Sequence, residues 1–467
     1  MSVFRPAVLA VALATALSAG TFAPQARAAT APVVDIAYDS FTLPNGLRVI
    51  VHTDRKAPIV AVNVWYHVGS KDEPAGRSGF AHLFEHLMFE GSAHYDRSYF
   101  HPLQRAGAVL NGSTNADRTN YWEVVPTGAL ELALWMESDR MGHLLPALTG
   151  AKFANQRDVV LNERRQNYEN RPYGLAPIAL LAALFPPDHP YHWPTIGSAD
   201  DLRAARLEEV RDFFVRFYHP ANASLALAGD VETGKALALV ERYFGDIPPG
   251  PPVEPISRDV SLAGEVRLVM EDAVELPRLY LAWHSPAIFA PGDAEMDLVA
   301  EALGEMKISR LYRRLIFDER MATDVSTVQQ SRELSGFFQV VVTAAPGRSL
   351  TELDEAVSSE IAAFAADGPT ASELELGLAQ AEAQFVFRLQ TVGGFGGKSD
   401  QLNQYNVFLG DPAYLVRDLE RYRAATPESV RQAAEQVLVR APRVALSVVP
   451  KGRLDLALPG SSKVVCS

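Results

Sequence analysis

A proline-rich segment near the middle of the 467-residue chain sets the strongest limit on its fold. From Ile247 to Pro255 the chain carries five prolines and a glycine, a density that neither a helix nor a central strand tolerates. We therefore predict a linker at residues 247–259 between an N-terminal domain, 29–246, and a C-terminal domain, 260–467. The chain is also longer than one ordinary hydrophobic core requires, which favours two domains.

The two halves repeat one order of elements: two strands, a helix, two strands, two long helices and a closing strand. The first half is expected to hold the strands Leu47–His52, Ile59–Val68, Val109–Thr114, Thr119–Val125 and Ser224–Ala228 and the helices Ala81–Phe89, Ala129–Leu144 and Phe153–Tyr168. The second is expected to hold the strands Glu265–Met270, Arg278–His284, Asp324–Gln329, Gly336–Ala344 and Arg443–Val449 and the helices Ala294–Ile316, Leu350–Ala365 and Ala371–Leu389. The repeat predicts an α+β fold of two homologous domains, each a mainly antiparallel sheet with helices packed on one face.

Residues 1–28 have the pattern of a cleaved secretory signal peptide. Arg5 precedes an apolar stretch at 7–19, and an A-x-A cleavage site follows at 26–28. The apolar stretch is too short to anchor the mature protein, and no later run is long enough, so we expect no membrane span. The only cysteine, Cys466, excludes an internal disulfide framework and a cysteine zinc site. An exported chain without disulfides favours a bacterial periplasm.

The formal net charge of the chain is −13. An acidic surface repels phosphate groups, so we expect no nucleic-acid partner. The same charge weakly favours basic or neutral substrates, and simple solubility explains it equally well.

Residues 82–86 read H-L-F-E-H, the inverted form of the zinc-protease motif H-E-x-x-H. On a helix His82 and His86 lie one turn apart on the same face, so their imidazoles can hold one zinc ion. Glu85 lies beside them and can act as a base on water at the metal. The first helix of the second half has no such motif at residues 298–303, so we expect one Zn²⁺ per chain, in the N-terminal domain.

A catalytic zinc site also needs a third protein ligand and an open position for water. The charged helix predicted after residue 153 offers several carboxylates, and the pattern alone does not choose among Glu163, Glu169 and Asp158.

The inverted motif, its context Gly79–Gly91 and the segment Arg157–Glu163 together resemble the pitrilysin family of zinc metallopeptidases. The likeness is greatest to the bacterial branch that resembles the mitochondrial processing peptidase. It extends over nearly all of the mature chain and includes Tyr191–Gly197 and Phe217–Asn222. The resemblance implies that Glu163 is the third zinc ligand, and that two chains form a clamshell of which this chain is one half.

The chain departs from the family pattern at two places. Relatives often carry a supporting glutamate seven residues before the third ligand, where this chain has Gln156. Two helical turns separate these positions, so Gln156 shares the face of the ligand and is expected to support the site without adding charge. An ordinary helix-surface role for this glutamine is the alternative.

The second departure concerns an arginine and a tyrosine that many relatives use to bind the substrate and stabilise the tetrahedral intermediate. In the matching stretch, Ser309–Val325, those positions hold Ile316 and Thr323. Arg310 and its neighbours could replace the pair only after a shift of one helical turn. The resemblance instead implies a heterodimer in which a homologous subunit supplies the Arg/Tyr pair.

The segment Val109–Asn115 resembles the family strand along which an extended peptide adds to the sheet edge beside the zinc. Asn111, Gly112 and Ser113 are therefore our candidate substrate contacts, although Asn-Gly is equally typical of a hairpin turn. The glycine-rich segment 393–399 lacks the first glycine and the preceding strand of a phosphate loop. We expect it to be a flexible connection that lines a substrate cavity.

These features predict a periplasmic zinc endopeptidase subunit that hydrolyses oligopeptides or unfolded segments with a glutamate base. One alternative is a non-catalytic peptide-binding or assembly subunit, which the intact ligand set disfavours. The other alternative is a self-sufficient homodimeric peptidase.

Overall fold

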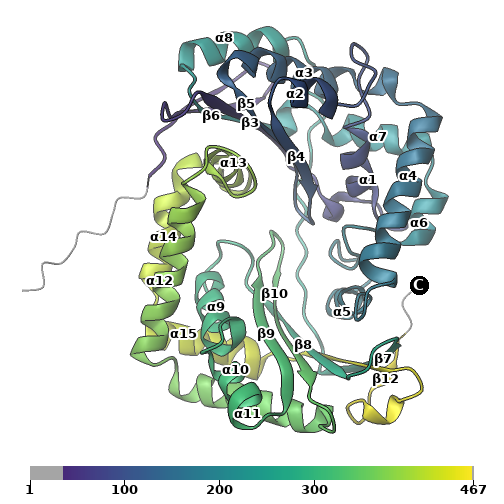
Figure 1. The fold of residues 1–467 in the computed structure, drawn as a ribbon, viewed down its shortest axis with the longest axis vertical. Coiled ribbons are helices and arrows are strands. Elements are labelled where there is room, and N and C mark those ends of the chain that lie inside the picture. The colour runs from purple at the N-terminus through teal and green to yellow at the C-terminus, as the bar shows by residue number, and fades with distance from the viewer. Residues whose placement is uncertain (1–34, 465–467) are drawn as a thin grey trace, which may run out of the picture. The chain divides into compact units, whose positions relative to one another are not determined.

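The computed structural model describes residues 35–464, so the predicted signal at 1–28 and Cys466 lie outside the described residues. Across this range, none of the helices combines the length and apolar character needed to cross a membrane. Two six-stranded sheets with their helices make up the fold (Figure 1). The predicted α+β class with two sheet-and-helix halves is therefore confirmed.

The first sheet has the strand order β1-β2-β6-β3-β5-β4 and places β4 at an edge. Its strands are antiparallel except for the β2–β6 pair. The bounds are β1 Asp39–Thr42, β2 Arg48–Thr53, β3 Ile59–Tyr66, β4 Val109–Thr114, β5 Thr119–Pro126 and β6 Ala223–Gly229. Alternate valines of β3 enter the core beneath the helices, because successive side chains of a strand point to opposite faces.

The helices of the first half surround this core, and α1, α3 and α8 contact the sheet directly. Their bounds are α1 Phe80–Leu87, α2 Phe100–Arg105, α3 Leu130–His143, α4 Gly150–Arg164, α5 Ala176–Leu184, α6 Ala199–Ala204, α7 Leu207–Phe217 and α8 Thr233–Phe244. Between α8 and the next strand the chain contains no helix or strand, as its proline density predicts.

The second sheet has the order β12-β7-β11-β8-β10-β9, with parallel pairing among its first three strands and antiparallel pairing in the rest. Its strands are β7 Val266–Asp272, β8 Arg278–Ser285, β9 Ala322–Gln330, β10 Gly336–Ala344, β11 Val444–Pro450 and β12 Ser462–Lys463. The helices of this half are α9 Asp293–Ala300, α10 Arg310–Tyr312, α11 Leu350–Asp367, α12 Ala371–Arg388, α13 Lys398–Leu409, α14 Leu415–Arg423 and α15 Pro427–Ala434.

The single helix expected at Ala294–Ile316 is wrong, because the structure interrupts it. After α9 a π-helical segment, Glu301–Glu305, ends at Met306, which is extended. The chain re-enters a helix after Ser309, whose hydroxyl donates a 2.5 Å hydrogen bond to the carbonyl of Met306. A serine that bonds the local backbone favours such a break over a continuous helix.

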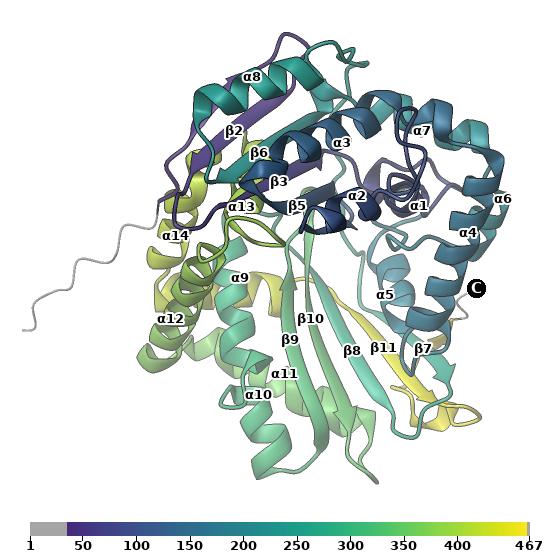
Figure 2. The ribbon, with the colours of Figure 1, turned by 45° about the horizontal axis from the view of Figure 1, so that its top comes forward.

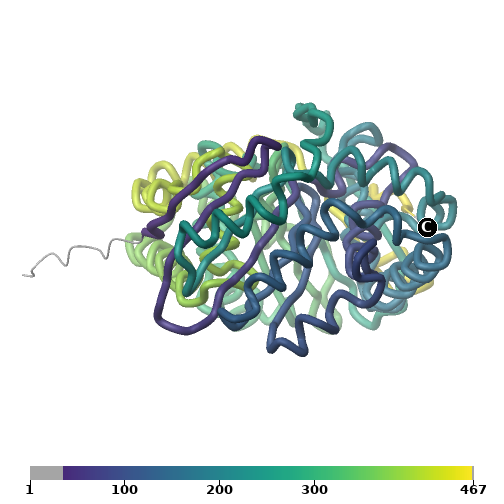
Figure 3. The backbone as a smooth tube through the Cα atoms, turned by 90° about the horizontal axis from the view of Figure 1, so that it is seen from above, coloured from purple at the N-terminus to yellow at the C-terminus, as the bar shows by residue number. Residues whose placement is uncertain are grey.

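Each sheet receives a helix from the opposite half on its second face. The helix α13 contacts β3 and β6 of the first sheet, and α5 contacts β8 and β11 of the second (Figure 2). Apolar side chains fill both contacts, since Leu402 shares one buried cluster with Ile50 and Leu180 shares another with Leu446. In Figure 3 the purple start of the described chain runs beside the yellow-green helices, where Ile36 packs in the cluster that contains Tyr405.

A buried carboxylate fixes α13 to the first sheet. Asp400 Oδ1 accepts hydrogen bonds from Asn63 Nδ2 at 3.1 Å, Trp65 Nε1 at 2.8 Å and Asn120 Nδ2 at 3.0 Å. Its other oxygen accepts from the backbone N–H of Gly396 at 2.7 Å. One carboxylate of the second half thus accepts from three side-chain donors on the face of β3 and β5 that points away from α1.

Candidate metal centre

The helix α1 carries the inverted motif on the face opposite its core contacts. Leu83, Phe84 and Leu87 are fully buried in the first core, which turns the two histidines and the glutamate of the motif toward α4. Gly79 directly precedes the helix, and its φ of +93° favours glycine. A Cβ at that position would lie 3.0 Å from the carbonyl oxygen of Ile196, so glycine lets the helix start against this segment.

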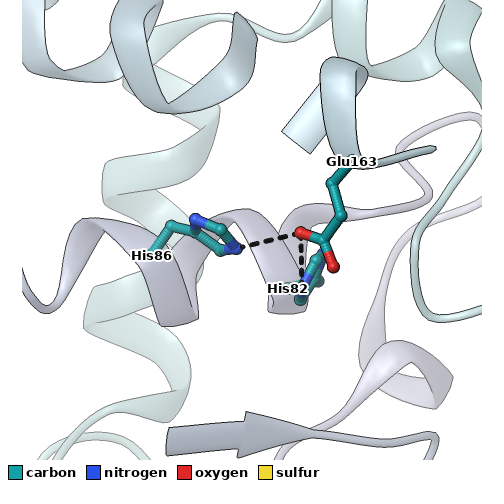
Figure 4. A group of neighbouring side chains, drawn as sticks. All are labelled: His82, His86 and Glu163. Carbon is teal, nitrogen blue, oxygen red and sulfur yellow. Dashed lines mark ion pairs between the residues drawn. The ribbon is translucent and has the colours of Figure 1, made fainter. Parts of the chain in front are cut away.

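The structure brings together the three predicted ligands, His82, His86 and Glu163 (Figure 4). Glu163 Oε2 lies 3.8 Å from His82 Nε2 and 3.5 Å from His86 Nε2. One ligand atom from each residue falls within 4.8 Å of the other two. Two imidazole nitrogens and one carboxylate, converging from α1 and the end of α4, form a donor set that suits a catalytic zinc ion.

The pKa values of these residues reflect their burial and their mutual contacts. The pKa of His82 is lowered to about 4, because burial and the neighbouring His86 disfavour its charged form, and it is therefore neutral near pH 7. Burial acts to lower the pKa of His86 as well, but Glu163, Glu85 and Gln156 together outweigh it and the pKa is raised. Contact with His86 lowers the pKa of the Glu163 carboxyl, which stays ionised. Of the alternative third ligands, Glu169 pairs with Arg164 and Asp158 lies next to Arg157.

Glu85 is held beside the three ligands by the edge strand. Its Oε2 accepts a 2.6 Å hydrogen bond from the hydroxyl of Thr114, the last residue of β4. Burial raises the pKa of the Glu85 carboxyl, while this hydrogen bond opposes the rise. We did not predict the role of Thr114, although it lies inside the strand segment that resembles the family's substrate strand.

Gln156 links the ligand His86 to a second carboxylate. His86 Nδ1 lies 3.3 Å from Gln156 Oε1, and Gln156 Nε2 donates a 2.7 Å hydrogen bond to Glu90 Oε1. An amide can meet both neighbours, because its oxygen accepts while its nitrogen donates to the carboxylate. The arrangement orients Nε2 of His86 toward Glu163. Glu90 was missed by the sequence reasoning, and its position directly after the motif helix is the one signal that could have indicated it.

Replacing Gln156 by alanine is expected to weaken zinc binding about 10- to 100-fold, because the outer hydrogen bond that orients His86 is lost. Competition with a chromogenic chelator measures the affinity directly. Gln166→Ala is a matched control, because Gln166 is an exposed glutamine in the continuation of the same helix. Equal affinities for the two variants would contradict a positioning role for Gln156.

The three candidate substrate contacts lie within β4 and not in a hairpin turn. Asn111 Oδ1 accepts from the backbone N–H of Gly112 at 2.8 Å, and the Ser113 hydroxyl donates to Asn120 Oδ1 at 2.7 Å. A Cβ on Gly112 would lie 3.1 Å from Cζ of Phe89, so glycine permits close packing of β4 over the end of the motif helix.

Ile316 and Thr323, the positions matched to the family's arginine and tyrosine, are not replaced by a free arginine among the residues 310–314 nearby. Ile316 packs partly buried against the second core, and Thr323 is exposed in β9. The neighbouring arginines already have partners, since Arg310 pairs with Glu373 at 2.7 Å and Arg314 with Glu319 at 2.8 Å.

The fold and the ligand group agree with two matching family models. Residues 48–188 match the model described as Insulinase (Peptidase family M16), and residues 204–381 match the Peptidase M16 inactive domain. The chain belongs to peptidase family M16, the insulinase or pitrilysin family, which confirms the resemblance read from the motifs.

Its relatives include the zinc protease PqqE of Helicobacter pylori, which is 28% identical over 79% of this chain and 84% of the relative. A probable mitochondrial-processing peptidase subunit beta of Arabidopsis thaliana is 26% identical over 56% of this chain and 50% of its own length. The crystal structure of a protease from Helicobacter pylori superposes with a TM-score of 0.80 at 25% identity, covering 89% of this chain and 100% of that one. The periplasmic protease PqqL from Escherichia coli shares the fold, with a TM-score of 0.73 at 17% identity over 91% of this chain and 49% of that one.

Proposed function

We propose that the chain is the zinc-bearing subunit of a periplasmic endopeptidase that hydrolyses oligopeptides or unfolded protein segments. The convergence of His82, His86 and Glu163, with Glu85 held beside them, is the observation that carries this proposal. The names of the relatives as zinc proteases support it. The periplasmic location is supported by the secretory signal pattern at residues 1–28.

His82, His86 and Glu163 would hold one zinc ion per chain. Zinc in such a site acidifies water and polarises the carbonyl of the scissile peptide bond. Glu85 accepts the proton of the attacking water while the water oxygen bonds to the carbonyl carbon. It then delivers this proton to the departing amine as the carbon–nitrogen bond breaks. Burial suits Glu85 to both steps, because a raised carboxyl pKa strengthens the base.

The peptide is proposed to lie extended along the free edge of β4, which ends at the hydroxyl that holds Glu85. Main-chain hydrogen bonds to an edge strand tolerate many sequences, which suits unfolded segments as substrates. Asn111 would exchange its bond to the Gly112 N–H for a bond to the peptide backbone.

The oxyanion site is proposed to be completed by a homologous subunit. Ile316 and Thr323 offer neither a cation nor a phenol, and Arg310 and Arg314 are engaged in ion pairs. A partner that supplies an arginine and a tyrosine would stabilise the negative charge that develops on the carbonyl oxygen.

The chain assayed alone is expected to show at least about 100-fold lower kcat/KM than its mixture with a homologous subunit that carries the Arg/Tyr pair, since each missing oxyanion donor costs about that factor. Cleavage of a quenched fluorescent peptide measures the difference. A chelator should abolish the activity of the mixture, and added zinc should restore it. Full activity of the chain alone would favour the self-sufficient homodimer. Peptide binding without cleavage in any mixture would favour the non-catalytic subunit.

A further inference from the structure

We propose that the first sheet carries an apolar subsite, about five residues from the scissile bond, for one large apolar side chain of the peptide. This inference rests on the proposed function and adds a substrate preference to it. The subsite lies on the sheet face opposite α1, where the second half contributes one wall.

A cavity of about 430 Å³ opens between this face and the glycine-rich segment. Its lining includes Ile59, Val109, Trp122 and Val124 from the sheet and residues 390–394 from the second half. Strand register places the four sheet residues on one face, because Val109 pairs with Val124 and Asn111 pairs with Trp122. The lining is mostly apolar, so an apolar group gains free energy by entering.

The wall from the second half is held against the sheet. A Cβ on Gly393 would lie 2.5 Å from the Cβ of Ala61 and 2.7 Å from Cγ2 of Val124, so only glycine permits this approach. Asp400 binds the N–H of Gly396 and fixes the start of α13 just beyond. Lys398 Nζ pairs with Asp54 at 2.5 Å at the rim of the cavity. Residues 393–396 are thus packed against the first sheet and form one side of the cavity, whereas their glycines had indicated a flexible connection.

The free edge of β4 connects this cavity to the catalytic residues. Thr114, at one end of the strand, binds Glu85, and Val109, at the other end, lines the cavity. Five residues of strand span roughly 17 Å at about 3.3 Å per residue. A peptide added to this edge directs alternate side chains to the face of the metal ligands and to the face of the cavity. The residue beside Val109 is then about five positions from the bond that is cut.

Three features of the cavity fit a peptide as the occupant. Val109 is 65% exposed although it is a large apolar residue of a strand. Phe395 is 51% exposed and packs edge-on to Trp122 with ring centroids 5.4 Å apart. Trp122 lines the cavity beside them, and Val109 lies on the edge strand to which an extended chain can add. An apolar side chain would cover the first two residues and contact the indole, while its main chain pairs with the strand edge.

The test uses the subunit together with its homologous partner and a peptide series with one common scissile bond. One position at a time, from three to six residues on either side of that bond, is either leucine or aspartate. At one position the leucine peptide should exceed the aspartate peptide at least about 10-fold in kcat/KM, since burial of an apolar side chain is worth that factor. Val109→Asp should bring this ratio close to one. Val439→Asp is the matched control, because Val439 is 50% exposed on another surface, and it should keep the wild-type ratio.

A ratio in Val109→Asp equal to that of wild type, or no positional preference at all, would overturn the subsite. Isothermal titration calorimetry measures the binding of the same peptides to a Glu85→Gln variant, in which cleavage does not interfere. The leucine peptide should bind about 10-fold more tightly than the aspartate peptide to that variant. Absence of cleavage with this binding preference retained would overturn the proposed peptidase function alone, and cleavage without any preference would overturn the subsite alone.

Discussion

Replacing Glu85 by glutamine is expected to lower kcat/KM by about 10³-fold while the chain keeps its zinc, as loss of a general base commonly does. Glutamine has nearly the same shape as glutamate and can still accept the hydrogen bond from Thr114, so the fold around the site should persist. It cannot accept the proton of water, and the proton transfer to the leaving amine fails with it. Peptide cleavage and zinc content, measured on the same sample, separate catalysis from metal binding.

The second half offers a matched control for this substitution. Glu301 begins the π-helical segment after α9 and corresponds in sequence to Glu85 of the motif, and burial raises its pKa to about 7. Glu301→Gln makes the same chemical change in a helix without histidines and should leave kcat/KM within about twofold, since it touches no reacting group. Retention of more than a tenth of the activity in Glu85→Gln would contradict the assignment of the base.

Replacing Asp400 by alanine is expected to lower the free energy of unfolding by about 3 kcal/mol, because it leaves several buried donors without an acceptor. Asn63, Trp65 and Asn120 all donate to this one carboxylate, which is 8% exposed. Equilibrium unfolding in urea measures the change through the shift in midpoint.

An exposed aspartate of the same half provides the comparison. Asp318, whose side chain is 62% exposed, lies 3.8 Å from Arg313 and should tolerate alanine with a change below about 0.5 kcal/mol. If Asp400→Ala were as mild as Asp318→Ala, the carboxylate would not hold α13 to the sheet.

The strands and the motif helix were predictable because their patterns are local. The predicted strand Val109–Thr114 agrees with β4 at both ends, and the inverted motif falls on α1 as expected. The interruption of the predicted helix Ala294–Ile316 was not predictable, since one glycine and one serine weigh little against an otherwise helical sequence. Tertiary contacts decide such breaks, and here Gly304 lies so close to Thr327 that a Cβ would be 2.7 Å from its Cγ2.

The residues of the candidate metal centre likewise differ in how far the sequence alone could predict them. The i, i+4 spacing of His82 and His86 indicated two ligands, whereas Glu163 required the family resemblance, because several carboxylates share its helix. The supporting residues Thr114 and Glu90 act through contacts between elements distant in sequence, and no periodicity reveals such pairs. The second face of β3 carries Asn63 among apolar residues, and α13, which covers this face, lies more than 300 residues further along the chain.

The packing of α5 and α13 on the sheets of the opposite halves has a consequence for expressing the two halves separately. Each half encodes a helix that covers the sheet of the other, so a cut in the proline-rich linker would leave both fragments with a bare apolar surface. Each fragment alone would tend to aggregate. The two would regain the native fold only when they associate, by fragment complementation. The two halves are therefore similar in architecture but are expected to fold together and not as separate units.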